Sequence, residues 1–288
     1  MASPVNQNKV KGHSPHARSS GDRGAQKNVN AHFDTNAAYW DDVYSDDGLQ
    51  SVIYQQRQAA VLDYVDAAGL SPGSSVLEIG CGAGHLTVRL AQRKLKVDAV
   101  DSSPGMVDLA SRQAADAGFA DDVSVSQADV HALPFKPDQF DLVVAVGVIP
   151  WLHSPGEAVA EMARVLRPGG ELVLTADNAA RLISFTDPRA LLALTPLRSV
   201  YHRLRSRSGE AVSRLHFPSR VSGFVSEAGL TPLAHRTVGF GPLSVLGRPL
   251  LSDARAVAVN RRLQRLADAG VPGARGTGWH YLLRAVKR

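Results

Sequence analysis

The sequence predicts an α/β fold in which a doubly wound, mostly parallel sheet carries helices on both faces. Short apolar runs of strand length alternate along the chain with stretches of helical periodicity. Strand–helix–strand units of this kind form parallel sheets with right-handed crossovers. One such unit, 75–90, joins its strand to its helix through a glycine-rich turn, 80–84. Ligands of these sheets bind at the carboxyl ends of the strands, so the turn also predicts where a binding site lies.

The strand of this unit is short and almost continuously apolar. Val76, Leu77 and Ile79 predict a central strand that is covered on both faces. The glycines of the turn permit positive φ angles and leave room for a ligand beside the free N–H groups of the next helix, which favour an anionic group. Glu78 stands two residues before the turn, where it is placed to accept hydrogen bonds or to hold a cationic group of the ligand.

The glycine spacing narrows the ligand class. A dinucleotide-binding turn has the pattern G-x-G-x-x-G, whereas this turn reads G-x-G-x-G and has His85 where the third glycine would stand. An ordinary tight turn is the alternative interpretation. Cys81 is the single cysteine of the chain, so no intrachain disulfide and no cysteine-cluster metal site are expected. In this turn it serves as a small residue rather than as a nucleophile.

The strands that follow end in residues suited to a nucleoside. The second strand ends in Asp101, whose carboxylate is placed to accept hydrogen bonds from both hydroxyls of a ribose. The third strand ends at Asp129, which is placed to meet an adenine amino group. Met106, in the helix between these strands, is placed to touch the adenine ring. The fourth strand runs through 145–147 into a loop, and a fifth strand follows a Pro-Gly-Gly turn.

Four segments in this order carry a family resemblance: VLEIGCGAGHLT, AVDSSPGM, ADVHALPF and ARVLRPGGELVLT. From about residue 33 to residue 174 the chain resembles the class I S-adenosylmethionine-dependent methyltransferases, in particular the small-molecule group. The resemblance implies a Rossmann-like sheet of seven strands with an antiparallel last hairpin, and S-adenosylmethionine as the cofactor. It implies that the cofactor-binding residues are Tyr39, Glu78, Gly80, Cys81, Gly82, Gly84, Asp101, Ser102, Met106, Asp129, Val130, Ala145 and Val146.

The N-terminal segment, residues 1–31, is expected to be a disordered basic tail. It carries five basic residues against one acid, a net charge of +4, and almost nothing apolar. The methyltransferase domain is therefore expected over 32–288, with ordered structure beginning near Phe33. Tyr39 and Trp40 are interpreted as residues that cover the bound cofactor, and packing of both rings on the sheet is the alternative.

Periodicity and turn residues predict the remaining elements. Gly69 and Pro72 end a helix that leads into the first strand, and arginines interleave the apolar positions of a late helix. The expected elements are helices at 49–68, 104–117, 219–229 and 254–269, and strands at 230–238 and 279–286.

An insertion at 178–217 is basic and apolar at once. Residues 178–220 contain eight arginines, one aspartate and one glutamate, which gives a net charge of +6. We interpret the insertion as a lid that supplies an apolar wall and an anion-attracting rim for the acceptor substrate. A pair of surface helices that contacts an anionic membrane, and so collects an amphiphilic substrate, is a second interpretation. A structural cap is a third.

The chemistry expected of such a site is in-line methyl transfer. A methyl group on a sulfonium is already activated, so the protein has mainly to align it with the acceptor. A hydroxyl acceptor also needs a general base. His153, in the loop after the fourth strand, is the first candidate, and the others are His85, His131 and His216. Many relatives carry two histidines where this chain has Pro-Trp at 150–151, so the resemblance assigns no base.

The sequence thus predicts a methyltransferase that acts on a small molecule with an oxygen or carbon nucleophile, amphiphilic or anionic. A nicotinamide-dependent oxidoreductase is the first rival, and a non-catalytic protein that binds nucleic acid or membrane is the second. Most of the net charge of +5 lies in the tail, so a nucleic-acid partner is not expected. No metal site is expected either, because no histidine–carboxylate cluster has ligand spacing. The absence of an apolar signal core predicts a cytoplasmic protein.

Overall fold

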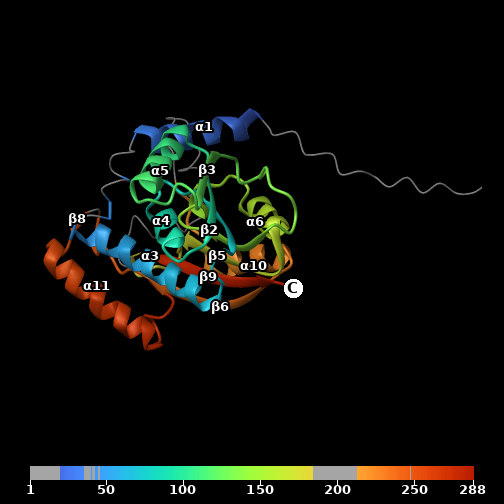
Figure 1. The fold of residues 1–288 in the computed structure, drawn as a ribbon. Coiled ribbons are helices and arrows are strands. Elements are labelled where there is room, and N and C mark those ends of the chain that lie inside the picture. Colours follow the sequence, from blue (N-terminus) through green and yellow to red (C-terminus); the bar gives the residue numbers. More distant parts are fainter. Residues whose placement is uncertain (1–19, 36–39, 41–42, 45, 184–212, 247) are drawn as a thin grey trace, which may run out of the picture.

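The computed structural model describes residues 20–35, 40, 43–44, 46–183, 213–246 and 248–288. A sheet lies at its centre, between the helices (Figure 1). The sheet has seven strands in the order β3-β2-β1-β4-β5-β9-β6. These strands are β1 (Ser75–Ile79), β2 (Lys96–Asp101), β3 (Val123–Gln127), β4 (Phe140–Ala145), β5 (Leu166–Asp177), β6 (Leu230–Val238) and β9 (His280–Lys287). Strands β1 to β5 are parallel, and β9 is antiparallel to both of its neighbours. The doubly wound, mostly parallel sheet expected from the sequence is confirmed.

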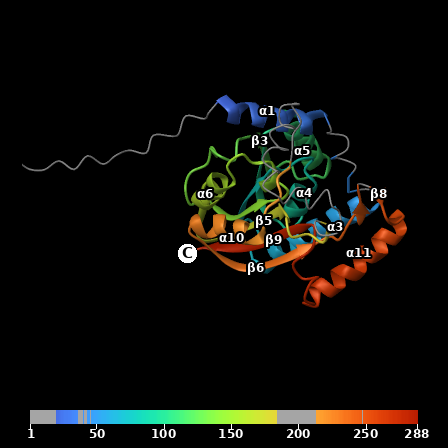
Figure 2. The ribbon, with the colours of Figure 1, turned by 180° about the vertical axis from the view of Figure 1, so that it is seen from behind.

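Helices cover both faces of the sheet (Figures 1 and 2). One face carries α3 (Leu49–Ala67), α4 (His85–Ala91) and α5 (Pro104–Asp116). The other face carries α6 (Pro155–Val165) and α10 (Pro218–Glu227). The remaining elements are α1 (Ser20–Thr35) beside α5, α11 (Asp253–Asp268) beside α3, the short 3-10 helix η1 (Ile149–Trp151), and the small hairpin of β7 (Ser244–Val245) and β8 (Arg248–Pro249).

Alternating apolar residues of the central strands supply both cores. On β4, Phe140 and Val143 belong to the core beneath α6 and α10, whereas Leu142 and Val144 belong to the core beneath α3 and α4. Neighbouring side chains of a strand point to opposite faces. A strand covered on both sides therefore favours apolar residues at successive positions. All six residues of β4 are buried, and all but Asp141 are apolar. Asp141 accepts a hydrogen bond from the backbone N–H of Ser75 and pairs with Arg167.

The antiparallel pair at the sheet edge is built differently from a hairpin with a tight turn. Strands β6 and β9 pair directly, but the chain between them passes through β7, β8 and α11. Because β9 runs against the parallel strands, its first residue lies at the edge where those strands end. His280 pairs with Asp177, the last residue of β5, on one side and with Val238, the last residue of β6, on the other.

The N-terminal region differs from the sequence expectation. Residues 20–31, expected to belong to a disordered tail, form most of helix α1. A polar helix of this length is only marginally stable by itself, so composition does not reveal it. Tertiary contacts supply what composition lacks: Asn30 exchanges two hydrogen bonds with Ser102, and Ser103 donates one to Asp34. The first nineteen residues of the tail lie outside the described residues.

No helix within the described residues is long and apolar enough to cross a membrane. The cytoplasmic location expected from the sequence stays a prediction.

Candidate functional site

A cavity of about 310 Å³ opens at the edge where the parallel strands end. Its wall is formed by the turns that follow β1, β2, β3 and β4, by the last residue of β5 and by the first residue of β9. Aromatic residues from the N-terminal part of the chain contribute to the same wall. They are Phe33, Trp40, Tyr44 and Tyr54.

Three glycines of the turn have positive φ angles, and they differ in what surrounds them. Gly80 lies against Val148, and a Cβ atom there would come within 2.4 Å of that side chain. Gly84 lies against helix α5, where a Cβ atom would be 2.9 Å from the backbone of Ala110. Gly82 has open space around its Cα and lines the cavity. Of the three glycines, Gly82 is therefore the one that leaves open space beside its backbone for a ligand.

The side chain of Asp101, the last residue of β2, is hydrogen-bonded to the backbone of the glycine turn. Its carboxylate accepts hydrogen bonds from the backbone N–H groups of Gly82, at 3.0 Å, and Ser103, at 2.9 Å. Burial raises the pKa of this carboxyl, and the backbone hydrogen bonds oppose that rise. The carboxylate also lines the cavity, so it is placed to accept hydrogen bonds from hydroxyl groups of a ligand.

Glu78 is a buried acid directly beneath the turn. Its Oε2 accepts a hydrogen bond of 2.6 Å from the hydroxyl of Thr87 on α4. Burial raises the pKa of Glu78 to about 8; the hydroxyl of Thr87 lowers it and nearby Asp101 raises it further. Burial also raises the pKa of the Cys81 thiol well above its ordinary value, which agrees with Cys81 serving as a small residue. A ligand with a positive group is the partner that would return Glu78 to its charged form.

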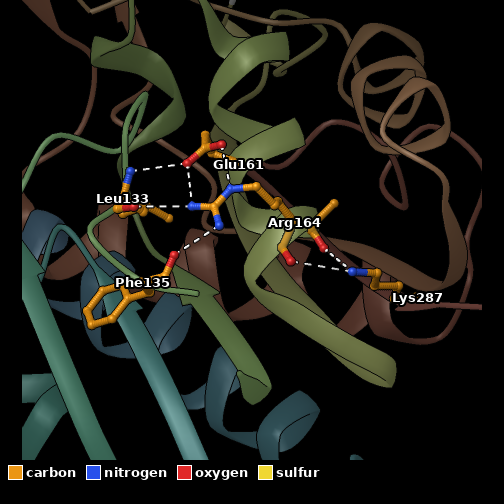
Figure 3. Close-up of polar contacts among 6 residues, drawn as sticks. Leu133, Phe135, Glu161, Arg164 and Lys287 are labelled. Atoms are coloured by element: carbon orange, nitrogen blue, oxygen red, sulfur yellow. Dashed lines mark hydrogen bonds and ion pairs between the residues drawn. The ribbon is translucent and has the colours of Figure 1, made fainter. Parts of the chain in front are cut away.

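The segment that carries Asp129 and Val130 is fixed from behind by an ion pair on α6. Glu161 accepts a hydrogen bond from the backbone N–H of Leu133, and Arg164 donates to the carbonyl oxygens of Leu133 and Phe135 (Figure 3). The two charged side chains also pair with each other at 2.8 Å. These contacts fix the backbone just after Asp129, so the side chains of Asp129 and Val130 are held at the cavity wall.

A second group of polar residues lines the cavity from β5 and β9, which β1 and β4 separate from β2 in the sheet. Asp177 and His280 are cross-strand neighbours, and Nδ1 of His280 lies 3.2 Å from Oδ1 of Asp177. Neither ring nitrogen of His280 makes a hydrogen bond among the described residues, so the contact of Nδ1 with Asp177 is an ion-pair distance only. Arg57, a buried residue of α3, lines the same wall and donates a hydrogen bond of 3.4 Å to the hydroxyl of Tyr44.

Burial and neighbouring charges determine the protonation states of His280 and Asp177. Burial lowers the pKa of His280 below its ordinary value, and the charges of Arg57 and Arg181 lower it further, whereas Asp177 raises it. Burial disfavours the Asp177 carboxylate, but contact with His280 and the charges of Arg57 and Arg181 outweigh it, so that its pKa is lowered. At neutral pH the imidazole is therefore neutral and the carboxylate charged.

Most of the predicted cofactor residues line this one cavity. Gly84 and Ala145 are near it but do not line it, since Gly84 packs on α5 and Ala145 is wholly buried in the core. Tyr39 lies outside the described residues. The predicted cofactor residues that line the cavity are Glu78, Gly80, Cys81, Gly82, Asp101, Ser102, Met106, Asp129, Val130 and Val146.

The candidate base His153 does not line the cavity. Its ring lies against the ring of His131, with centroids 3.9 Å apart, and its carbonyl oxygen accepts a hydrogen bond from Arg214. Nδ1 of His131 is in turn 2.8 Å from Asp129. The sequence reasoning missed Arg57, Asp177 and His280 instead. Asp177 could have been found because it ends the fifth strand, but His280 begins a strand, and only the antiparallel pairing places it at this edge.

The insertion is described only at its ends. The backbones of Ala179 and His216 are hydrogen-bonded, and the backbone N–H of Arg214 donates to the carbonyl of Pro150. Ser213 lines the cavity. The rest of the expected lid, residues 184–212, lies outside the described residues.

Comparison with known proteins agrees with this architecture. The family described as the methyltransferase domain matches residues 77–174, which contain the glycine turn, both acidic strand ends and the whole of β4. This part of the chain is thus similar to S-adenosylmethionine-dependent methyltransferase domains. No nicotinamide-dependent oxidoreductase stands among the matches reported below.

Individual relatives are similar over limited lengths. The methyltransferase domain is 36% identical over 113 residues to a ubiquinone/menaquinone biosynthesis C-methyltransferase from Hahella chejuensis, which covers 38% of this chain and 45% of the relative. The chain thus spans about half the length of that relative. A ubiquinone biosynthesis O-methyltransferase from Azoarcus sp. is 26% identical over 186 residues, covering 64% of this chain and 75% of the relative.

Similarity in structure extends over more of the chain. A crystal structure of magnesium protoporphyrin IX methyltransferase from Synechocystis with bound S-adenosylhomocysteine superposes with a TM-score of 0.61. The match covers 91% of this chain and 100% of that chain at 17% sequence identity. At this identity the match shows a shared fold.

The residues present fit the cofactor of the family. The open backbone at Gly82, the cavity-facing carboxylate of Asp101 and the buried acid Glu78 stand in one wall. S-adenosylmethionine carries ribose hydroxyls and positive groups, which are the groups these acids are suited to hold. When bound, it supplies an activated methyl group.

Proposed function

We propose that this protein transfers a methyl group from S-adenosylmethionine to a small-molecule acceptor. The observation that carries the proposal is that a single cavity joins two chemically different walls. One wall contains the glycine turn, Asp101 and Asp129. The other contains Tyr54, Arg57 and the Asp177–His280 pair, which contact one another. A cavity with a cofactor wall and a separate wall for a second molecule is what a transfer reaction requires.

The cofactor wall assigns a role to each acid. Asp101 accepts hydrogen bonds from the ribose hydroxyls, Asp129 accepts one from the adenine amino group, and Glu78 holds the positively charged amino-acid end. Met106, buried beneath the cavity, packs against the adenine. Gly80, Cys81, Gly82, Ser102, Val130 and Val146 complete this wall.

The acceptor wall supports an oxygen or carbon nucleophile on an aromatic or anionic molecule. The rings of Phe33, Trp40 and Trp151 form a cluster that lines the same cavity, with centroid separations of 5.3 and 5.4 Å. Arg57 is buried, and its Nε has no hydrogen-bond partner among the described residues. An aromatic acceptor would stack on the rings, and an anionic substituent would pair with the guanidinium. The named relatives include both a C- and an O-methyltransferase, so similarity does not choose the atom.

Binding of the cofactor tests the proposal directly. Isothermal titration calorimetry with S-adenosylmethionine and S-adenosylhomocysteine should give saturable binding to the parent protein. Asp101→Ala should weaken it about 100-fold, since two hydrogen bonds to a charged group contribute about 3 kcal/mol together. Asp98→Ala is the matched control, because Asp98 lies on the same strand but does not line the cavity.

The control should bind like the parent. A folded parent protein that binds neither compound would rule out the proposed function and would return attention to a non-catalytic role of the fold. Equal weakening by both substitutions would mean that the loss reflects strand β2 as a whole rather than the carboxylate at its end.

A further inference from the structure

Sheet topology brings a histidine to the acceptor wall from an unexpected direction. Parallel strands deliver their last residues to the site, and β9 delivers its first because it is antiparallel. His280 is thereby placed beside Asp177, although the two residues are far apart in the sequence. Both side chains line the cavity.

The two ring nitrogens of His280 differ in their surroundings. Nδ1 lies 3.2 Å from the Asp177 carboxylate, within ion-pair distance but outside hydrogen-bond geometry, and Nε2 has no polar partner among the described residues. The ring stacks on Tyr54 of α3 with centroids 5.9 Å apart and an interplanar angle of 28°. Only 3% of the residue is exposed. A buried polar nitrogen without a partner is uncommon in folded proteins, and here it belongs to a side chain of the cavity wall.

The charged and titratable groups around His280 come from three elements. Strand β5 contributes Asp177, the segment just after β5 contributes Arg181, and α3 contributes Arg57 and Tyr54. The two arginines oppose a positive charge on the imidazole, and the carboxylate favours it. Burial and the arginines prevail, so the ring is neutral near pH 7 and its pKa lies below the ordinary value. A neutral imidazole is the form that accepts a proton.

We propose that His280 is the general base of the methyl transfer, that Asp177 is its positioning residue, and that the acceptor carries a hydroxyl group that is not ionised in solution at neutral pH. This inference rests on the proposed function and adds to it the class of acceptor, a phenol or enol, and the residue that removes its proton.

In the methyl transfer, the acceptor oxygen uses a lone pair to form a bond to the methyl carbon while the carbon–sulfur bond breaks. The electron pair of that bond stays on sulfur, which becomes a neutral thioether. The hydroxyl proton passes to Nε2 of His280. The imidazolium that results is stabilised by the Asp177 carboxylate at Nδ1, and it later releases its proton to water. Arg57, on the same wall, attracts the negative charge that develops on the oxygen.

Methyl transfer to two hydroxyl probes of different acidity tests the inference. Catechol is un-ionised at pH 7.5, whereas 4-nitrophenol is largely ionised there and needs no base. With labelled S-adenosylmethionine, His280→Ala should lower the rate with catechol by about 10²- to 10⁴-fold, the usual contribution of a general base. The rate with 4-nitrophenol should fall far less.

Two histidine controls separate His280 from its rivals. His235→Ala is the matched control, because His235 lies exposed on the neighbouring strand β6 and does not line the cavity; it should leave both rates unchanged. His153→Ala removes the candidate named by the sequence. A rate loss with catechol in His153→Ala but not in His280→Ala would overturn the assignment.

The pH profile distinguishes chemical from structural roles. In the parent protein kcat with catechol should rise with pH and reach a plateau. The midpoint of the rise should lie below pH 6.5, because the pKa of His280 is lowered from that value. In His280→Ala it should keep rising as catechol itself ionises. Asp177→Asn should move the limb of the profile to still lower pH and reduce kcat about 10-fold, with little change in KM, because it removes the group that raises the pKa of His280.

The outcomes separate this inference from the proposed function. A parent protein that binds S-adenosylmethionine but methylates neither hydroxyl probe would overturn the inference and leave the proposed function standing. Equal rate losses with both probes in His280→Ala would overturn the base role. Failure of the parent to bind the cofactor would end both.

Discussion

The two walls of the cavity are built on opposite principles. The cofactor wall comes from consecutive strand–turn–helix units, and its glycine turn, Glu78 and Asp101 lie within one stretch of the chain. The acceptor wall is assembled from helix α3, the end of β5 and the start of β9, which meet only in the folded protein. Local sequence patterns therefore predict the cofactor wall well and the acceptor wall poorly. Under the proposed function, the local wall binds the cofactor that the family shares, and the assembled wall binds the acceptor.

The acids of the two walls also differ in charge. Glu78 has little near it to offset burial and is neutral in the ligand-free protein, whereas Asp177 is kept charged by its basic neighbours. Glu78 in the cofactor wall thus becomes charged only when a positive group of the ligand binds beside it. The charge of Asp177 in the acceptor wall is already balanced by the neighbouring arginines. Four predictions examine this contrast, from the largest expected effect to the smallest.

The largest effect is expected from the pH dependence of Glu78. Its pKa is about 8 in the folded protein against about 4.5 unfolded, so its contribution to stability is full below about pH 4.5 and is lost as pH rises to about 8. The loss is on the order of 1.4 kcal/mol per pH unit, or about 4 kcal/mol between pH 5 and pH 8. Urea unfolding of Glu78→Gln should lack this slope.

S-adenosylmethionine should also flatten the slope of the parent, because its positive group favours the charged carboxylate. Its affinity should accordingly fall as pH drops below about 8. An identical pH slope in the parent and in Glu78→Gln would show that Glu78 is not held neutral and would break the contrast.

The glycine turn should respond unequally at its two later glycines. Gly84→Ala places a Cβ 2.9 Å from the backbone of Ala110 at φ +89°, and it should destabilise the protein by about 3 kcal/mol through strain and overpacking. Gly82→Ala meets only the backbone cost, about 1 kcal/mol, because open space surrounds its Cα. Chemical denaturation measures both.

Calorimetry of the same two variants should reverse the order. Gly82→Ala intrudes into the cavity and should weaken S-adenosylmethionine binding, whereas folded Gly84→Ala should bind normally. Equal losses of cofactor affinity in the two variants would mean that ligand binding and packing in the turn cannot be assigned to separate glycines.

Asp177→Asn should separate the walls most directly. The substitution leaves Arg57, Arg181 and His280 without their carboxylate, and we expect a stability loss of about 2 kcal/mol. Cofactor affinity should stay within twofold of the parent, because Asp177 stands in the other wall. Thermal unfolding and calorimetry on one preparation measure both quantities, and a large drop in cofactor affinity would show that the walls are coupled.

The smallest effect is expected at the support behind Asp129. Glu161→Gln weakens the hydrogen bond to Leu133 and the pair with Arg164, and should cost about 1 kcal/mol of stability and a few-fold in cofactor affinity. Asp66→Asn, which breaks an exposed pair with Arg93, should change stability by about 0.5 kcal/mol or less and leave binding unchanged. If the two variants behave alike, the pair on α6 is an ordinary surface contact.

Particular residues show what kind of information each wall needed. The strands at 75–79, 96–101 and 230–238 agree with the sequence, as does the cofactor class, because apolar runs and turn glycines act over a few residues. Helix α1 was missed within the expected tail, since its order depends on contacts of Asn30 and Asp34 with Ser102 and Ser103, just before α5. His153 was preferred as base because it follows a strand, yet the structure places His280 at the cavity wall and leaves His153 beside His131.

The sequence by itself determined the parallel sheet, the glycine turn and the acids of the cofactor wall, because strand burial and turn geometry are set by neighbouring residues. Only the tertiary structure decided the acceptor wall. A histidine at the start of a strand reaches the site only if that strand runs antiparallel beside β5, and an arginine on a covering helix is buried at the cavity only if the helix packs in one register. Both conditions depend on contacts between distant residues, which no local pattern of the chain records.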